Sequence, residues 1–150
     1  MTIHELTVAE CEDFLGHAAV GRLACAHMGQ PYIVPVSVYF DREEKCLYGF
    51  SALGTKIEWM RANPKVCIEV DAIAERSEWT TVLVMGRYEE LDASAAHGPQ
   101  RQRALDLFQE QPRWWLPGLA KVSPGVEHPS PVVYRIHISS ISGRRAVRQQ

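Results

Sequence analysis

The chain has 150 residues, of which 46% are hydrophobic and 23% are charged, with a formal net charge of −2. This composition is typical of a globular domain with its own core, and the near-zero charge argues against binding to nucleic acid or to an anionic membrane. No apolar run approaches the roughly 20 residues of a transmembrane helix, and the first residues lack the basic-then-apolar pattern of a signal peptide. We therefore expect a single cytoplasmic domain over residues 1–150, with the four cysteines as reduced thiols.

The first third of the chain predicts one helix followed by three strands. Thr7 and Glu10 have the spacing of a capping box, which predicts a helix over 7–15 that stops at Gly16. Strands are expected over 20–27, 32–40 and 45–50, the first two joined by a turn at 28–31 and the last two by a polar loop. The strand over 32–40 alternates, so its even-numbered residues should share one buried face.

Pro35 interrupts this third segment. It has no N–H to donate to a neighbouring strand, so the segment should border a sheet edge or an opening at that point. Two interpretations remain open. The segment is either a simple edge strand or a place where a planar ligand approaches the backbone.

The stretch from Cys46 to Asp71 organises the rest of the chain, as a strand, a turn, a short helix and a second strand. Thr55 and Glu58 again have capping-box spacing. Lys56 in the first helical turn is unfavourable beside the positive end of the helix dipole unless an anion lies nearby. Together with the Ser51 and Thr55 hydroxyls and the N–H groups near Gly54, it could hold a phosphate group. The alternative is an ordinary capped helix with a solvated lysine.

The second half of the chain predicts three strands and one helix. Asn63-Pro64 should end the short helix, and strands are expected over 66–71, 79–91 and 132–140, with a bulge at Gly86. A polar loop should cover 73–78, a helix 99–111, and irregular segments 113–118 and 122–130, while the tail at 143–145 should leave the sheet. Trp114 and Trp115 lie in the first irregular segment, where they suit a core, a subunit interface or a stacking contact.

These elements predict a mainly β fold with flanking helices: a six-stranded antiparallel barrel of Greek-key type. A six-stranded barrel has little interior space beyond its side chains. A sizeable ligand must then bind outside the barrel or between subunits, which favours a dimer.

Short motifs follow one another in a fixed order from the first helix to the end of the chain. They are GRL at 21–23, PYIVPV at 31–36, FSALGTK at 50–56, NPKV at 63–66, VD at 70–71, WTTV at 79–82, GR at 86–87 and SGR at 142–144. In this order they resemble the FMN-binding split-barrel family related to pyridoxamine phosphate oxidase, in its nitroimidazole-resistance reductase-like branch.

The resemblance implies a homodimer with FMN at the subunit interface. It assigns the phosphate to Ser51, Thr55 and Lys56, the isoalloxazine ring to Pro35, Val36 and Ser37, and the polar ring edge or ribityl chain to Thr80 and Thr81. Trp114 and Arg144 are further candidates, supplied across the interface by the second subunit. The chain departs from the family at two positions. Phe50 stands where many reductase-type relatives have a histidine, and Thr55 stands where the true oxidases have an arginine.

The function implied by the resemblance is an FMN-dependent oxidoreductase that reduces a small planar acceptor, with a nicotinamide or a deazaflavin as electron donor. No catalytic side chain is assigned, although Ser37 and Tyr39 are candidates for a general acid. No histidine and cysteine spacing fits a metal site. The alternatives are a pyridoxamine phosphate oxidase-type enzyme, and a non-catalytic flavin or haem protein with His97 or His137 as axial ligand. A nucleic-acid-binding barrel is disfavoured by the net charge and by Glu89-Glu90.

Overall fold

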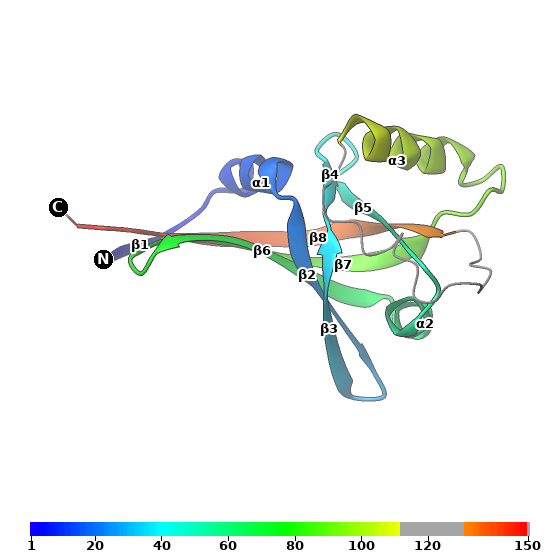
Figure 1. Cartoon of the computed structure of the whole chain (residues 1–150), viewed down its shortest axis with the longest axis horizontal. Helices are drawn as coiled ribbons and strands as arrows, with labels where there is room; N and C mark the ends of the chain where they lie inside the picture. The colour runs from blue at the N-terminus through cyan, green and yellow to red at the C-terminus, as the bar shows by residue number, and fades with distance from the viewer. Residues whose placement is uncertain (112–130, 150) are drawn as a thin grey trace, which may run out of the picture.

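The computed structural model describes residues 1–111 and 131–149. These form eight strands and three helices, shown in Figure 1: β1 (Thr2–Glu5), α1 (Val8–His17), β2 (Val20–His27), β3 (Gln30–Ser37), β4 (Tyr39–Asp41), β5 (Cys46–Ser51), α2 (Thr55–Ala62), β6 (Lys65–Glu75), β7 (Glu78–Glu90), α3 (Gly98–Glu110) and β8 (Val132–Val147). None of the described helices is long and apolar enough to cross a membrane.

The strands form one antiparallel sheet in the order β3-β2-β6-β7-β8-β5-β4, and β1 pairs with β8. β3 and β4 lie at opposite ends of this order, yet only Val38 separates them in the chain. The sheet must therefore curl until its two ends approach each other, which makes the barrel. The predicted fold class is confirmed, with eight strands in place of six.

The two additional strands are β4 and β1. The predicted strand over 32–40 breaks at Val38, and Tyr39 turns into a second core, where it is 1% exposed. β1 was not predicted, because its four residues are mostly exposed and show no alternation. It is held by pairing with β8.

The ends of β6 and β8 also differ from the prediction, because pairing with neighbouring strands extends both. The loop predicted over 73–78 is the tip of a hairpin, with β6 reaching Glu75 and β7 beginning at Glu78. The Gly143-Arg144-Arg145 tail does not leave the sheet as predicted, because β8 continues to Val147 between β7 and β1. Backbone pairing holds these segments, whose sequences show no hydrophobic alternation.

Several local predictions are confirmed. Thr7 caps α1, with the Glu10 N–H donating to Thr7 Oγ1 at 3.2 Å and the Thr7 N–H donating to Glu10 Oε1 at 3.1 Å. The helix continues through Gly16 to His17, two residues beyond the predicted end. Asn63 ends α2 in an extended conformation, and the pairing of β7 with β8 shifts register beside Gly86. All four cysteines are free thiols.

The described residues form two hydrophobic clusters. The larger is formed by β2, β3, β5, β6, β7 and β8 with α1 and α2, and the smaller lies under α3. Buried carboxylates hold the helices in place. Glu12 of α1 is 7% exposed and accepts from Lys45 Nζ at 2.7 Å, while Asp41 is 4% exposed and pairs with Arg103 of α3.

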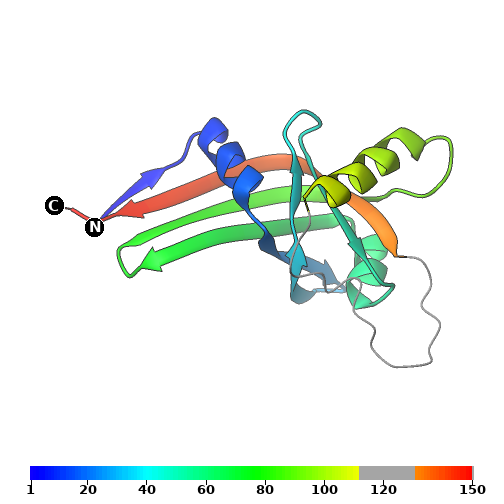
Figure 2. The same ribbon diagram turned by 45° about the horizontal axis from the view of Figure 1, so that its top comes forward.

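β6, β7 and β8 extend beyond the barrel as a long ladder, with the two chain termini together at its far end (Figures 1 and 2). Residues paired across antiparallel strands project from the same face. On one face, Gly143 lies against Cys11 of α1. We call the opposite one the open face. In the register it is formed by Ile3, Glu5, Arg22, Ala24, Ile33, Pro35, Cys67, Glu69, Asp71, Ile73, Trp79, Thr81, Leu83, Met85, Ser140, Ser142, Arg144 and Ala146.

Candidate functional site

The first candidate group lies in the connection between β5 and α2, where a phosphate site was predicted. The capping box proposed for Thr55 and Glu58 is wrong. Gly54 is the N-cap and supplies no side-chain hydrogen bond, and Thr55 is the first helical residue. Because glycine has no side chain to accept from the first N–H groups of α2, these groups have no side-chain cap.

Lys56 lies in this first turn. Its side chain is partly buried, and burial lowers the pKa of its ammonium group from the ordinary value. Within residues 1–111 and 131–149 it has no ion pair. A partly desolvated cation beside uncapped N–H groups is a suitable environment for an anion.

The two hydroxyl groups of this connection differ in exposure. Ser51, at the end of β5, is 3% exposed and donates to the Ala52 carbonyl oxygen at 2.8 Å. The Thr55 side chain is exposed. Phe50, which replaces the family histidine, lies 4.8 Å from Phe108 of α3 between ring centroids. It therefore belongs to the smaller cluster, which explains an aromatic residue at this position.

α2 packs against the β2–β3 hairpin. The Trp59 ring lies 5.7 Å from His27 and 5.4 Å from Tyr32, and Asn63 Nδ2 donates to the Ala26 carbonyl oxygen at 3.0 Å. This packing places the helix beside β3, the end strand of the sheet.

β3 carries the residues assigned to the flavin ring. The edge position predicted from Pro35 is confirmed, because within residues 1–111 and 131–149 the strand β3 pairs with β2 alone. The Pro35 side chain is exposed on the open face, and Ser37 follows on the same face. Val36 is 5% exposed and belongs to the larger cluster. A ligand at this strand would therefore meet the side chains of Pro35 and Ser37 and the backbone of Val36.

Thr80 and Thr81 project to opposite faces of β7. The Thr80 hydroxyl accepts from Arg145 Nε at 3.2 Å, on the face that α1 covers. The Thr81 hydroxyl donates to Glu69 Oε1 at 3.2 Å, on the open face. The structure thus brings Thr81, and not the side chain of Thr80, to the face that carries Pro35 and Arg144.

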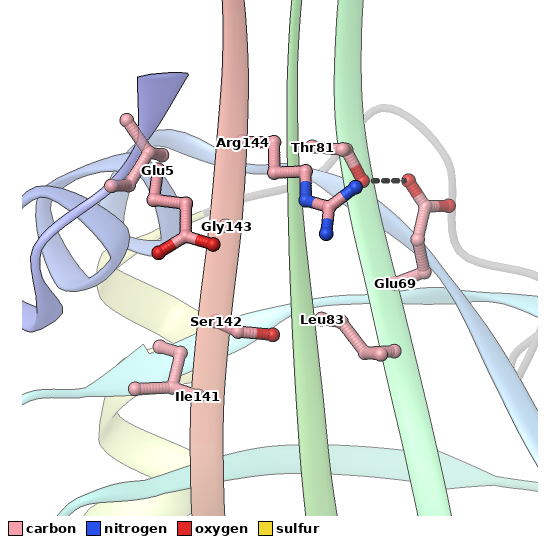
Figure 3. Close-up of a pocket in the computed structure, with 9 residues that line it drawn as sticks. Glu5, Glu69, Thr81, Leu83, Ile141, Ser142, Gly143 and Arg144 are labelled. Atoms are coloured by element: carbon pink, nitrogen blue, oxygen red, sulfur yellow. Dashed lines mark hydrogen bonds between the residues drawn. The ribbon is translucent and has the colours of Figure 1, made fainter. Parts of the chain in front are cut away.

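Arg144 pairs in register with Thr81 and lines a hollow of about 470 Å³ on the open face. In Figure 3 its guanidinium reaches from β8 across β7 toward Thr81 and Glu69, while Glu5 lies on the other side of β8. Arg144 is exposed and has no ion pair in the described parts of the chain. A second hollow of about 350 Å³ adjoins it, between Glu69, Ile73 and Trp79.

A charged network beside these hollows was not predicted from the sequence. Arg22 Nη1 lies 3.0 Å from Asp71 Oδ2 and 3.8 Å from Glu69 Oε2. Burial raises the pKa of Glu69, and the hydrogen bond and charge of Asp71 raise it further. Arg22 and Asp71 fall within recognised motifs, but the register that joins them to Glu69 depends on the pairing of β2 with β6.

The remaining candidates do not join either group. Trp114 and Trp115 lie outside the described residues. His97 Nδ1 lies 3.1 Å from Asp92, and His137 Nε2 lies 3.5 Å from Glu89. The described site therefore has two parts: the β5–α2 connection with Ser51, Thr55 and Lys56, and the open face with Pro35, Ser37, Thr81 and Arg144.

Comparisons with known proteins agree with the motifs. A family model described as pyridoxamine 5'-phosphate oxidase matches residues 7–145. The chain is 38% identical to an uncharacterized protein of Rhizobium meliloti (strain 1021), over 83% of this chain and 81% of the relative. It is 40% identical in sequence to a FAD-binding protein from Mesorhizobium loti. The crystal structure of that protein matches the fold with a TM-score of 0.79, over 99% of both chains. A FAD-binding protein from Mycobacterium smegmatis, 21% identical, covers 99% of this chain and 100% of its own with a TM-score of 0.66, which shows a shared fold. The chain belongs to the pyridoxamine 5'-phosphate oxidase family, whose split barrel it adopts.

Proposed function

We propose that this protein is an FMN-dependent oxidoreductase that works as a homodimer and reduces a small planar acceptor. The observation that carries the proposal is Lys56, a partly buried cation at the start of α2 with no acidic partner among the described residues. A terminal phosphate with two negative charges would supply the missing counter-ion.

The residues at the β5–α2 connection fit such a phosphate. Lys56 would bind it through its ammonium group, the exposed Thr55 hydroxyl through a hydrogen bond, and the uncapped N–H groups of α2 through their positive dipole end. Ser51 is buried and already donates to Ala52, so it would contribute an acceptor oxygen or position the connection.

The open face fits the rest of the cofactor. Pro35 presents a flat apolar surface on an end strand, and Thr81 supplies a hydroxyl oxygen for the polar edge of the ring. When bound, the flavin would supply the electron-transfer chemistry, while these residues hold and orient it. We expect a ligand that contacts both parts of the site to lie along β3, the end strand of the sheet formed by the described residues.

A second copy of the chain is the partner that suits the open face. Four of its side chains are large, apolar and exposed: Ile3 (49%), Ile33 (65%), Ile73 (73%) and Met85 (47%). The face also carries both signs of charge, with Arg22 and Arg144 beside Glu5, Glu69 and Asp71. Such a surface can complement itself across a two-fold axis. Arg144 of one subunit would then be available to a cofactor bound mainly by the other.

The relatives support a flavin without deciding which one. The Mesorhizobium loti protein, at 40% identity, is described as binding FAD. We favour FMN because Lys56 and Thr55 offer one compact site for a terminal phosphate. The electron donor would be a nicotinamide or a deazaflavin that docks over the ring. Four free thiols agree with a reducing compartment such as the cytoplasm.

The proposal is tested by spectroscopy of the purified full chain, as isolated and after addition of flavin. We expect the two visible absorption bands of bound flavin and preference in the order FMN, FAD, riboflavin. Anaerobic reduction with NADH, NADPH or a reduced deazaflavin should then bleach these bands, and a planar acceptor should restore them. A chain that stays colourless with added flavins, or that binds riboflavin as well as FMN, would refute the phosphate site. A Soret band would favour haem instead.

A further inference from the structure

Glu69 of β6 is held on the open face by groups from the two neighbouring strands. Its Oε1 accepts from Thr81 of β7 at 3.2 Å, and its Oε2 lies 3.8 Å from Arg22 of β2. Asp71, two residues further along β6, binds the same guanidinium at 3.0 Å. One arginine thus serves two carboxyl groups that project in the same direction.

The other charged groups at the two hollows do not balance the negative charge of Glu69 and Asp71. Arg144 of β8 and Glu5 of β1 line the larger hollow with Glu69. Among the described residues the charged set at these hollows is therefore Arg22, Arg144, Glu5, Glu69 and Asp71. With every group ionised, this set has an excess of one negative charge.

Covering the open face removes water from these carboxyl groups. Burial already raises the pKa of Glu69, and Asp71 raises it further through a hydrogen bond and its charge. Loss of water disfavours the ionised form of a carboxyl group. A planar ligand or a partner subunit over the hollows therefore favours a proton on this pair.

The hydrogen bond also sets the polarity of Thr81. Because the Thr81 hydroxyl donates its proton to Glu69, its oxygen retains lone pairs that can only accept. The polar edge of a flavin ring contains an N–H group that could donate to this oxygen.

We propose that Glu69 is a positioning residue of this site: it fixes Thr81 as a hydrogen-bond acceptor and, with Asp71, takes up a proton from solvent when the cofactor covers the open face. The inference rests on the proposed function. No bond of the ligand is broken, and the proton is shared between Glu69 Oε2 and the Asp71 carboxyl group.

The test is calorimetric titration of FMN into the full-length protein in two buffers of different ionisation enthalpy. Because the Glu69 carboxyl group has a raised pKa, the titration is repeated at a series of mildly acidic pH values, and we expect uptake of up to about one proton per bound FMN. Glu69→Gln keeps the side-chain size and should lose this uptake. The matched control is Glu89→Gln on β7, because Glu89 pairs with Arg135 and His137 away from both hollows. It should keep the uptake.

The outcomes separate the two proposals. FMN binding without proton uptake, or equal uptake by wild type and Glu69→Gln, would overturn the role of Glu69 and leave the proposed function standing. Failure of wild type to bind FMN would overturn both. Should Glu69→Gln not fold, Asp71→Asn removes the other member of the pair, and retained uptake in that variant would equally refute the shared proton.

Discussion

Thr80 and Thr81 are adjacent on β7, but their hydroxyl groups serve opposite faces of the sheet. Thr80 accepts from Arg145 Nε at 3.2 Å beside α1, and Thr81 donates to Glu69 Oε1 at 3.2 Å on the open face. The resemblance to flavin proteins assigned both residues to the cofactor. The alternation of a strand allows only one of the two side chains to contact a ligand on either face.

Valine substitutions should distinguish the two threonines, because valine keeps the branched shape and removes the hydroxyl. Thr81→Val should weaken FMN binding by about tenfold, the effect of losing one hydrogen bond of roughly 1.4 kcal/mol. Thr80→Val should leave FMN affinity unchanged. Quenching of flavin fluorescence measures both. Weaker binding in Thr80→Val alone would place the cofactor on the face that α1 covers.

Lys56→Ala should remove the preference for FMN over riboflavin. Charge-assisted hydrogen bonds contribute about 1.5–3 kcal/mol, so FMN affinity should fall by about 10- to 100-fold, whereas riboflavin affinity should not change. Lys65→Ala is a matched control, since Lys65 is an exposed lysine at the start of β6. A Lys56→Ala protein that still prefers FMN would show that the phosphate lies elsewhere.

The same variant has a second expected property in the absence of flavin. Burial lowers the pKa of Lys56, which means that the folded protein disfavours its charged form. The empty protein should therefore be no less stable after Lys56→Ala, as measured by thermal unfolding. A clear loss of stability would indicate a structural role for the lysine.

The sequence predicted the elements whose side chains show burial or capping patterns. The strand over 20–27 has the predicted bounds, the Thr7 and Glu10 box is present, and Pro35 marks an end strand. These features are local, because a hydroxyl group, a period of two or a missing N–H acts within a few residues.

Features that depend on distant pairing were missed. β1 and the last part of β8 show no hydrophobic alternation, and their pairing with each other and with β7 explains why they are strands. The network of Arg22, Glu69 and Asp71 requires the pairing of β2 with β6, which no local pattern reveals. The cap at Thr55 failed for a different reason: its spacing to Glu58 suited a capping box, but the helix begins one residue earlier than that motif needs.

Ile73→Glu should shift the protein from dimer to monomer. Ile73 is 73% exposed on the open face, and a carboxylate there would be desolvated in a self-complementary interface. We expect dimer affinity to fall by at least about tenfold, measured by sedimentation. Val8→Glu is the control, because Val8 is 57% exposed on α1, away from this face. Equal dimerisation of wild type and Ile73→Glu would exclude the open face as the interface.

The buried carboxyl group of Asp41 should make the free energy of unfolding depend on pH in the acidic range. Its burial tends to raise the pKa of its carboxyl group, but hydrogen bonds from Arg103, the Glu44 N–H and Tyr48 hold that pKa below the ordinary value of 3.8. A carboxyl group with a lowered folded-state pKa stabilises the fold above its unfolded-state pKa, and this contribution is lost as the pH falls through the folded-state pKa.

Arg103→Ala should therefore destabilise the protein by about 2 kcal/mol at neutral pH, since it leaves a buried carboxylate without its main partner. The difference in free energy of unfolding between wild type and variant should narrow below about pH 4, the ordinary pKa of an aspartate in the unfolded chain, as the pH falls toward the lowered folded-state pKa of Asp41. Urea unfolding at several pH values measures both effects. Arg101→Ala, on the same helix and without an ion pair in the described chain, should be near neutral. If the loss of stability in Arg103→Ala does not change with pH, Arg103 stabilises the protein through packing.

Gly143 and Gly16 should respond in opposite directions to the same added methyl group. A Cβ at Gly143 would lie 2.9 Å from Cys11 Sγ, 2.9 Å from Leu6 Cδ1 and 3.0 Å from the Thr81 carbonyl oxygen. Gly143→Ala should force α1 away from β8 and cost about 1–3 kcal/mol. A Cβ at Gly16 meets nothing within 4 Å, and alanine favours the helix, so Gly16→Ala should stabilise by about 0.5–1 kcal/mol.

Urea unfolding of the two variants measures this pair of effects, and FMN titration adds a functional readout. Because Thr81 and Arg144 flank Gly143 in the β7–β8 register, a shifted β8 should also weaken FMN binding in Gly143→Ala. Gly16 lies in α1, outside both parts of the site, so Gly16→Ala should bind FMN normally. If Gly143→Ala is as stable as wild type, the contact between α1 and β8 is looser than the 2.9 Å approach to Cys11 implies.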